Sequence, residues 1–183
     1  MGYDLMKVGM AGVGGIGSNV AVNLVRAGCT SLKIVDFDKV EHSNLNRQFY
    51  FVDQIGEFKV DMLQENLLKI APGAEIEALR LRLDSGNMAE TFQDCDILVE
   101  GFDEEESKKL LIEMFVGREL PIISASGIAG VSIEGIEVRQ LGNCTIVGDF
   151  QTDFKAAPLY SPKISVVSAM MADLVLRKGG YHE

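Results

Sequence analysis

A glycine-rich segment near the start of the chain has the residue types and spacing needed to hold a phosphate. Its glycines are Gly12, Gly14, Gly15 and Gly17, and they lie between an apolar strand and a helix with an apolar face, as in nucleotide-binding strand–turn–helix units. Gly12 permits a tight turn, Gly14 lets the backbone approach a phosphate, and Gly17 lets the helix pack on the strand. The N–H groups at the helix start favour an anion. For this motif alone, a tight turn without a ligand is the alternative.

Two acidic residues follow the next predicted strand. Asp36 comes 19 residues after Gly17, close to the spacing of about 20 at which an acidic side chain binds a ribose hydroxyl. A solvated turn carboxylate is the alternative for Asp36, and capping of the following loop is the alternative for Asp38. Together with the glycine turn, Asp36 predicts a nucleotide site.

A long polar segment, residues 37–56, separates these carboxylates from the next helix. Loops of this length in compact domains are usually functional. Arg47 is a planar, permanently charged donor suited to phosphate oxygens. Lys59 begins a predicted helix, where a cation opposes the helix dipole unless an anion lies nearby. A surface salt bridge is the alternative for either residue alone, but two cations beside a phosphate can neutralise charge that develops during phosphoryl or nucleotidyl transfer.

An acidic run, residues 103–106, follows another apolar strand. Acidic residues in a first helical turn are favoured as caps and by the dipole, which explains the run without any ligand. Asp103 differs from its neighbours because it directly follows the strand, on the same sheet edge as the glycine turn. It is therefore the candidate of this run for the site.

The elements that position these residues alternate between strands and helices. Strands are predicted at residues 5–11, 32–35, 75–83, 96–100 and 122–126, helices at 18–27, 59–70, 103–114 and 164–178, and a β-hairpin at 131–140 and 144–148. This alternation predicts a mainly parallel sheet covered on both faces. We expect an α/β, Rossmann-like three-layer fold with an added C-terminal antiparallel hairpin, in one domain of residues 1–183. The polar segment 148–162 is predicted to be mobile.

Three segments, residues 12–18, 35–48 and 55–59, resemble the ThiF/MoeB/ubiquitin-activating-enzyme superfamily in order and spacing. The string Ser43-Asn44-Leu45-x-Arg47-Gln48 is far more specific than the glycine motif. Residues 96–103 and 121–127 resemble the family's later strands, so the resemblance covers about residues 5–140. Within the superfamily the chain is most similar to the short ThiF-type adenylyltransferases of thiamine biosynthesis.

The resemblance implies a reaction, its cofactors and its partners. Such enzymes bind ATP and Mg²⁺, adenylate the terminal carboxylate of a ubiquitin-fold sulfur carrier protein that ends in Gly-Gly, and release pyrophosphate. A homodimer is also implied. By matching position, Asp36 binds the ribose, Asn44, Arg47 and Lys59 face the phosphates, and Asp103 organises magnesium. The catalytic candidates are Arg47, Lys59 and Asp103, and the nucleotide-binding candidates are Gly12, Gly14, Gly15, Gly17, Asp36, Asp38, Ser43, Asn44, Arg47, Lys59 and Asp103.

The chain departs from the family in three ways. Larger relatives have N-terminal helices that supply an arginine to a partner subunit, and no counterpart precedes the first strand here. No CxxC pair is present, so we expect no structural zinc. Cys29, Cys95 and Cys144 are isolated. Third, no obvious catalytic-cysteine loop follows the adenylation core. Cys144 is a sulfur acceptor, a site for an acyl link or, as we expect, a buried strand residue.

The whole-chain composition excludes several classes of partner. A net charge of −10 argues against nonspecific nucleic-acid binding and against anionic membranes. No apolar run approaches the roughly 20 residues that span a bilayer. An odd number of cysteines without a signal peptide indicates a cytoplasmic protein. Two alternatives to an adenylyltransferase remain: a nicotinamide-dependent oxidoreductase, which leaves Arg47 and Lys59 without a role, and a non-catalytic module that binds nucleotide or carrier.

Overall fold

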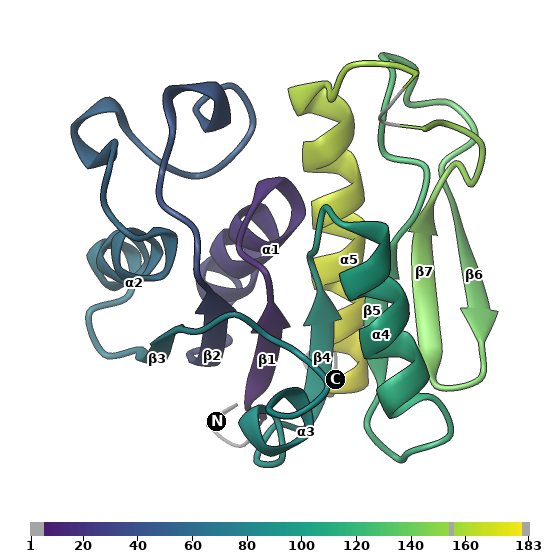
Figure 1. Ribbon diagram of the computed structural model, residues 1–183, viewed down its shortest axis with the longest axis horizontal. Helices are drawn as coiled ribbons and strands as arrows, with labels where there is room; N and C mark the ends of the chain where they lie inside the picture. Colours follow the sequence, from purple (N-terminus) through teal and green to yellow (C-terminus); the bar gives the residue numbers. More distant parts are fainter. Residues whose placement is uncertain (1–5, 154–155, 181–183) are drawn as a thin grey trace.

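A seven-stranded sheet in the order β3-β2-β1-β4-β5-β7-β6 organises the molecule (Figure 1). The structure is a computed structural model that describes residues 6–153 and 156–180. All neighbouring strands are parallel except the antiparallel pair β6 and β7, which confirms the predicted fold class. The strands are β1 (Val8–Ala11), β2 (Ser31–Asp36), β3 (Glu75–Arg80), β4 (Ile97–Glu100), β5 (Ile122–Ala125), β6 (Glu137–Leu141) and β7 (Cys144–Gly148).

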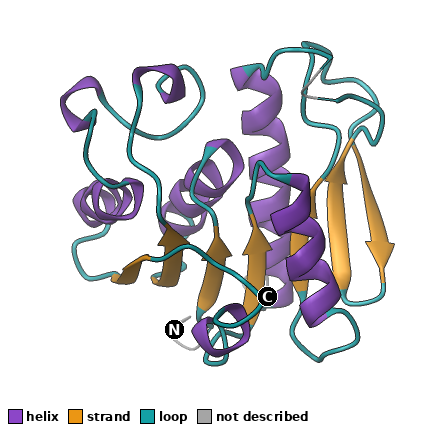
Figure 2. Ribbon diagram, in the orientation of Figure 1, coloured by secondary structure: helices purple, strands orange, loops and turns teal. Residues whose placement is uncertain are grey.

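Helices cover both faces of this sheet (Figure 2). The helices are α1 (Gly15–Arg26), α2 (Lys59–Ile70), α3 (Met88–Thr91), α4 (Glu105–Phe115) and α5 (Ser161–Lys178), with 3-10 turns η1 (His42–Asn44) and η2 (Val52–Gln54) between β2 and α2. On one face α1 packs against both α5 and α2, whereas α3 and α4 contact each other on the other face. No helix in the described part of the chain has the length and apolar character to cross a bilayer.

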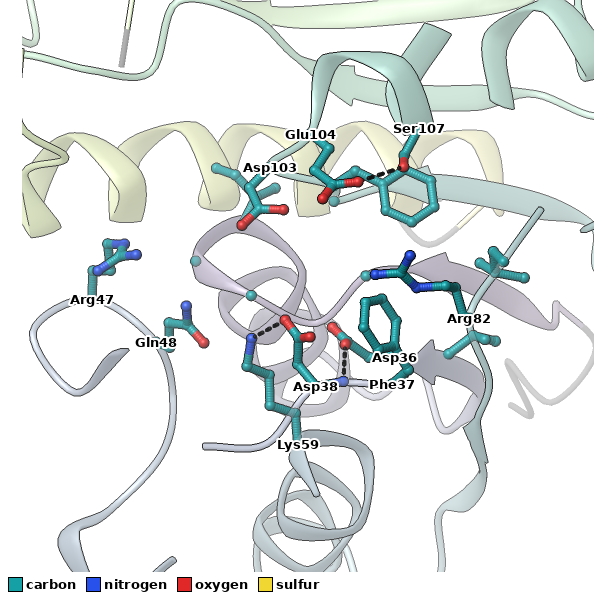
Figure 3. A pocket seen from close by; sticks show the side chains of 18 of the residues that line it. Asp36, Phe37, Asp38, Arg47, Gln48, Lys59, Arg82, Asp103, Glu104 and Ser107 are labelled. Carbon is teal, nitrogen blue, oxygen red and sulfur yellow. Dashed lines mark hydrogen bonds and ion pairs between the residues drawn. The ribbon is translucent and has the colours of Figure 1, made fainter. Parts of the chain in front are cut away.

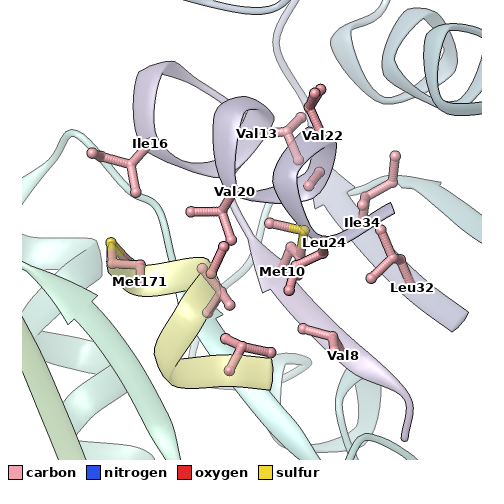
Figure 4. Close-up of a cluster of buried hydrophobic side chains, with 14 of the residues drawn as sticks. Val8, Met10, Val13, Ile16, Val20, Val22, Leu24, Leu32, Ile34 and Met171 are labelled. Atoms are coloured by element: carbon pink, nitrogen blue, oxygen red, sulfur yellow. The ribbon is translucent and has the colours of Figure 1, made fainter. Parts of the chain in front are cut away.

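The core divides into two apolar clusters because successive strand side chains point to opposite faces. Val8 and Met10 of β1 join the cluster beneath α1 and α5, whereas Ala11 joins the cluster beneath α3 and α4. Figure 4 shows the first cluster, in which Leu24 of α1 lies beside Met10 of β1, and Met171 of α5 lies on the side of Ile16 and Val20. This two-sided burial explains why the central strands are short, continuous apolar runs.

Several element boundaries differ from those predicted. Helix α1 begins at Gly15 rather than at residue 18, because glycines at a helix start look like turn residues in the sequence. Strand β3 ends at Arg80 rather than at residue 83, beside the end of β2, its one partner among the described strands. Strand β6 begins at Glu137 rather than at residue 131, because Gly135 has a φ of +75° and interrupts the extended backbone. The short helix α3 was not predicted.

Candidate functional site

A cavity of about 330 Å³ opens at the carboxyl edge of the sheet, where the strand order reverses between β1 and β4 (Figure 3). Ligands of open α/β sheets bind at this kind of crevice. Eight of the residues predicted from the sequence line the cavity: Gly12, Gly14, Gly15, Asp36, Asp38, Arg47, Lys59 and Asp103. The predicted residues Gly17, Ser43 and Asn44 do not line it.

The glycine turn is shaped by close backbone packing on one side and by the cavity on the other. Gly12 has a φ of +88°, and a Cβ there would lie 2.9 Å from the carbonyl oxygen of Gly101. A Cβ on Gly17 would lie 2.0 Å from the Gly12 carbonyl oxygen, so Gly17 allows the helix to pack on the turn. A Cβ on Gly14 or Gly15 would meet only side-chain atoms, those of Gln48 and Arg47, at 3.7 and 3.8 Å. The turn therefore exposes backbone to the cavity.

Asp36 is held firmly at the end of β2. Its Oδ2 accepts a hydrogen bond of 2.9 Å from the Val13 amide, and its Oδ1 accepts one of 2.9 Å from the Asp38 amide. Burial raises the pKa of the Asp36 carboxyl, and the two amide hydrogen bonds counteract part of that rise. The carboxylate is thus fixed beside the glycine turn, and its remaining lone pairs can accept hydrogen bonds from ligand hydroxyls.

Lys59 begins α2 with its ammonium group at the cavity wall. Its Nζ donates to Asp38 Oδ2 at 2.9 Å, and its amide donates to the Asp38 carbonyl oxygen at 2.9 Å. The anion that offsets the unfavourable position of Lys59 on the helix dipole is therefore a carboxylate of the chain itself.

The long connection between β2 and α2 is fastened onto the glycine turn and α1. The Tyr50 hydroxyl donates to the Val13 carbonyl oxygen at 2.7 Å, the Phe49 amide donates to Ser18 Oγ at 3.1 Å, and Asn19 Nδ2 donates to the Arg47 carbonyl oxygen at 2.8 Å. These bonds fix the part of the connection that carries Arg47.

Arg47 and Gln48 project from this fastened segment over the glycine turn (Figure 3). Arg47 Nη1 donates to the Ser43 carbonyl oxygen at 3.0 Å and to Asn46 Oδ1 at 2.8 Å. Within the part of the chain that the structure describes, Arg47 Nε and Gln48 Oε1 are buried without a hydrogen-bond partner. Buried polar atoms are nearly always paired, with protein groups, ligands or water, so this donor and acceptor are available to a polar ligand at the cavity. Gln48 lay in the string that carried the family resemblance, but the sequence assigned it no role.

Asn44 lies on the inside of the connection, whereas Ser43 is exposed on it. Asn44 is buried and its Oδ1 accepts a hydrogen bond of 3.0 Å from the Glu41 amide. Ser43 Oγ donates to Glu41 Oε2 at 3.2 Å. In this structure both residues shape the turn before Arg47.

Asp103 lies exposed in the turn between β4 and α4, at the cavity edge (Figure 3). Its carboxylate has no hydrogen bond or ion pair to any residue in 6–153 or 156–180. The turn before it is anchored by the fully buried Glu100, which accepts hydrogen bonds from the Phe102 amide at 2.8 Å and from Ser124 Oγ at 2.6 Å, and also pairs with Lys108. Glu100 therefore fixes the backbone that presents Asp103.

The residues around Asp103 fit a magnesium ion only if phosphate oxygens of a bound ligand complete its coordination. No group of three or more metal-ligating side chains lies together among the described residues. Magnesium is bound typically by one or two carboxylates plus phosphate oxygens and water. One carboxylate, unpartnered among the described residues, beside a cavity lined by the glycine turn matches that pattern.

Two parts of the cavity wall were not predicted from the sequence. Phe37, Leu81, Arg82 and Leu83 line it beyond Asp36, and Ile128, Leu159 and Ile164 line it from the C-terminal part of the chain. The exposed aromatic Phe37 directly after Asp36 is the one local signal that could have indicated the first of these groups.

Two further features of the C-terminal part concern the predicted roles of Cys144 and of segment 148–162. Cys144 is 1% exposed, and burial raises the pKa of its thiol to about 11. Asp149 Oδ2 lies 2.6 Å from the buried Lys163 Nζ. Mobility of the segment stays a prediction, and its residues 154–155 fall outside the described residues.

A scan against protein-family models finds the ThiF family over residues 4–178. The chain belongs to the ThiF family. This agrees with the resemblance carried by the glycine turn and the Ser43–Gln48 string.

Curated proteins that are similar to this ThiF-family chain are named for more than one activity. It is 35% identical over 123 residues to the adenylyltransferase and sulfurtransferase uba4 of Aspergillus clavatus, a match that covers 67% of the chain and 25% of that protein. It is 32% identical over 133 residues to the tRNA threonylcarbamoyladenosine dehydratase of Bacillus subtilis, covering 70% of the chain and 52% of that protein. The chain thus spans only part of these relatives.

Solved structures share the fold of this ThiF-family chain. The E. coli tRNA N6-threonylcarbamoyladenosine dehydratase in complex with AMP superposes with a TM-score of 0.89 at 18% identity, covering 97% of the chain and 87% of that structure. E. coli MccB with AMPCPP and MccA superposes with a TM-score of 0.75 at 22% identity, covering 99% and 57%. At these identities the likeness establishes the fold alone.

Proposed function

We propose that this ThiF-family chain is an ATP-dependent adenylyltransferase that activates a carboxylate as an acyl adenylate. The observation that carries the proposal is the convergence of Arg47, Lys59 and Asp103 with the glycine turn on one cavity. The orphaned Arg47 Nε supports a phosphate ligand there. A nicotinamide enzyme would leave Arg47 and Lys59 without a role in catalysis, and the family assignment also favours ATP.

The residues of the site suit an attack of one anion on another. An acceptor carboxylate oxygen forms a bond to the α-phosphorus of ATP, the bond from that phosphorus to the bridging oxygen breaks, and pyrophosphate leaves with the electron pair. The carboxylate is already ionised, so no general base is needed. Arg47 and Lys59 neutralise charge on the phosphates, and the fixed glycine turn aligns the phosphates for attack. Electrostatic stabilisation and positioning of this kind supply most of the rate acceleration in such transfers. Magnesium, held by Asp103 and phosphate oxygens, would add further neutralisation.

We propose that the acceptor is a ubiquitin-fold sulfur carrier that ends in Gly-Gly, in thiamine biosynthesis. The resemblance of the motifs to short ThiF-type proteins supports this, as does the relative named as an adenylyltransferase and sulfurtransferase. The tRNA dehydratase relative supplies a second candidate acceptor, a tRNA. The net charge of −10 favours a protein acceptor over a polyanion. We further propose that residues 1–183 act as one ATP-binding domain and that two copies form a homodimer.

ATP–pyrophosphate exchange tests the proposal. The assay contains the protein, ATP, Mg²⁺ and either a carrier ending in Gly-Gly, the same carrier without its last glycine, or bulk tRNA. Exchange that depends on the complete carrier is the expected result. Exchange or AMP formation that depends on tRNA would replace the proposed acceptor. ATP binding without turnover in any mixture would indicate a non-catalytic nucleotide-binding module, and NADH binding in place of ATP would indicate an oxidoreductase.

A further inference from the structure

The end of the cavity beyond Asp36 contains an arginine stacked on an aromatic ring. The Arg82 guanidinium carbon lies 4.2 Å from the centroid of the Phe37 ring. Both residues line the cavity, with Leu81 and Leu83 beside them. In Figure 3 the Arg82 guanidinium reaches over Phe37 on one side of Asp36, while Arg47 and Gln48 lie on the other side.

Stacking on Phe37 leaves the hydrogen-bonding capacity of Arg82 unused. A guanidinium carries its five N–H donors in its own plane, so a ring against one face does not block them. Within residues 6–153 and 156–180 the Arg82 guanidinium makes no hydrogen bond and no ion pair. The cation therefore offers several free donors at the cavity wall.

Arg80, two residues earlier, provides an internal comparison. Its guanidinium carbon lies 4.5 Å from the centroid of the Phe58 ring, and its Nη2 also pairs with Asp61 at 2.6 Å. Arg80 does not line the cavity. The two arginines have the same stacking, but only the charge of Arg82 is unpaired and faces the site.

The rest of the site determines which part of a nucleotide reaches Arg82. The phosphates are assigned to the glycine turn, Arg47 and Lys59, and the ribose to Asp36, so the base extends to the opposite end of the cavity. Arg82 is flanked on that wall by the apolar side chains of Leu81 and Leu83 and by Phe37, and the polar residues Glu104 and Ser107 also line the cavity. Apolar side chains suit the faces of a base, and ring nitrogens on its edge are hydrogen-bond acceptors.

We propose that Arg82 donates a hydrogen bond to a ring nitrogen of the nucleotide base and is a specificity-determining residue of this site. The inference rests on the proposed function, because it takes the ligand to be ATP. It adds to that function the contact by which the chain recognises the base rather than the phosphates.

Binding of ATP analogues to three proteins tests the inference. We would measure by calorimetry the Kd of ATP, 1-deaza-ATP, 3-deaza-ATP and 7-deaza-ATP for the wild type, Arg82→Gln and Arg80→Gln. Each deaza analogue replaces one ring nitrogen by a C–H group. We expect one analogue to bind the wild type about tenfold more weakly than ATP, the size of a lost hydrogen bond to a charged donor. In Arg82→Gln, ATP itself should bind about tenfold more weakly and that analogue should show no further loss, whereas Arg80→Gln should match the wild type.

The other results would overturn the inference in distinguishable ways. If each deaza analogue loses as much affinity relative to ATP in Arg82→Gln as in the wild type, Arg82 does not bind the base. That result would leave the proposed adenylation unaffected. If Arg82→Gln weakens inorganic tripolyphosphate as much as ATP, the residue binds phosphate instead. If none of the three proteins binds ATP, the inference falls together with the proposed function. The test measures nucleotide binding and not turnover, so its result does not depend on whether the protein catalyses pyrophosphate exchange.

Discussion

Lys59 Nζ lies 2.9 Å from Asp38 Oδ2, and the two side chains differ sharply in exposure. The Lys59 side chain is 8% exposed, whereas that of Asp38 is 45% exposed. A buried ammonium without a partner is strongly unfavourable, so Asp38 stabilises the charge of Lys59 while no nucleotide is bound. In the proposed reaction, phosphate oxygens would compete with Asp38 for the same donor.

Replacing Lys59 should therefore affect transfer more than folding. Lys59→Met keeps an unbranched side chain, one atom shorter, and removes its charge, and we expect it to lower the rate of ATP–pyrophosphate exchange about 100-fold. Lys39→Met is the matched control, because Lys39 is exposed and lies over the Phe58 ring, 5.0 Å from its centroid, outside the cavity lining. Equal losses in the two variants would contradict the role assigned to Lys59.

Asp103 should control the magnesium requirement of the reaction. Its carboxylate is exposed and unpartnered among the described residues, so Asp103→Asn should leave the midpoint of thermal unfolding nearly unchanged. We expect the Mg²⁺ concentration for half-maximal exchange to rise by at least about tenfold. The control is Glu106→Gln, an exposed acidic residue in the first turn of α4, three residues from Asp103, that does not line the cavity. A normal Mg²⁺ dependence in Asp103→Asn would remove Asp103 from the metal site.

The order of elements could be predicted because each central strand is a short apolar run followed by an apolar-faced helix. The start of α1 was placed too late because Gly15 and Gly17 have low helix propensity, and tertiary packing overrides it. That packing is visible only in three dimensions, where the Gly17 backbone meets the Gly12 carbonyl oxygen. Likewise the end of β3 depends on where β2 ends, which local sequence does not show.

The site could be predicted where its residues follow successive parallel strands, since these ends meet at one sheet edge. Asp36 and Asp103 reach the cavity in this way. Arg82 could not be predicted, because its place depends on the register that pairs Asp36 with Arg80 and carries the chain two residues past the sheet edge. The role of Asn44 stays a prediction: the family resemblance implies a phosphate contact, while its Oδ1 here accepts a hydrogen bond within its own loop.

The pair of Asp149 and Lys163 should contribute to stability in a pH-dependent way. Burial alone would raise the pKa of Asp149, but hydrogen bonds from Lys163 and from the amides of Thr152 and Gln151 outweigh it and hold the pKa below its usual range. A carboxyl with a lowered folded-state pKa contributes stability that is complete above its unfolded pKa, about 4, and is lost as the pH falls toward the folded value.

Asp149→Asn should thus be destabilising at neutral pH. Lys163 is 1% exposed at its side chain and would remain buried without its carboxylate, which costs about 3 kcal/mol of unfolding free energy. Glu113→Gln breaks an exposed pair with Lys109 and should change stability by about 0.5 kcal/mol or less. Urea unfolding at pH 7 and pH 3 measures both. The difference between wild type and Asp149→Asn should shrink at pH 3, and a constant difference would contradict the assigned cause.

Cys144 should react only when the protein opens. Burial raises the pKa of its thiol to about 11, and the thiolate is the reactive form, so ionisation alone should slow alkylation at pH 8 about 100-fold relative to an ordinary cysteine. We expect iodoacetamide to label Cys144 slowly in the native protein and rapidly in urea, with peptide mass spectrometry to separate it from Cys29 and Cys95. We also expect Cys144→Ser to retain pyrophosphate exchange. Fast native labelling together with loss of carrier-dependent sulfur transfer in Cys144→Ser would instead make Cys144 a sulfur acceptor.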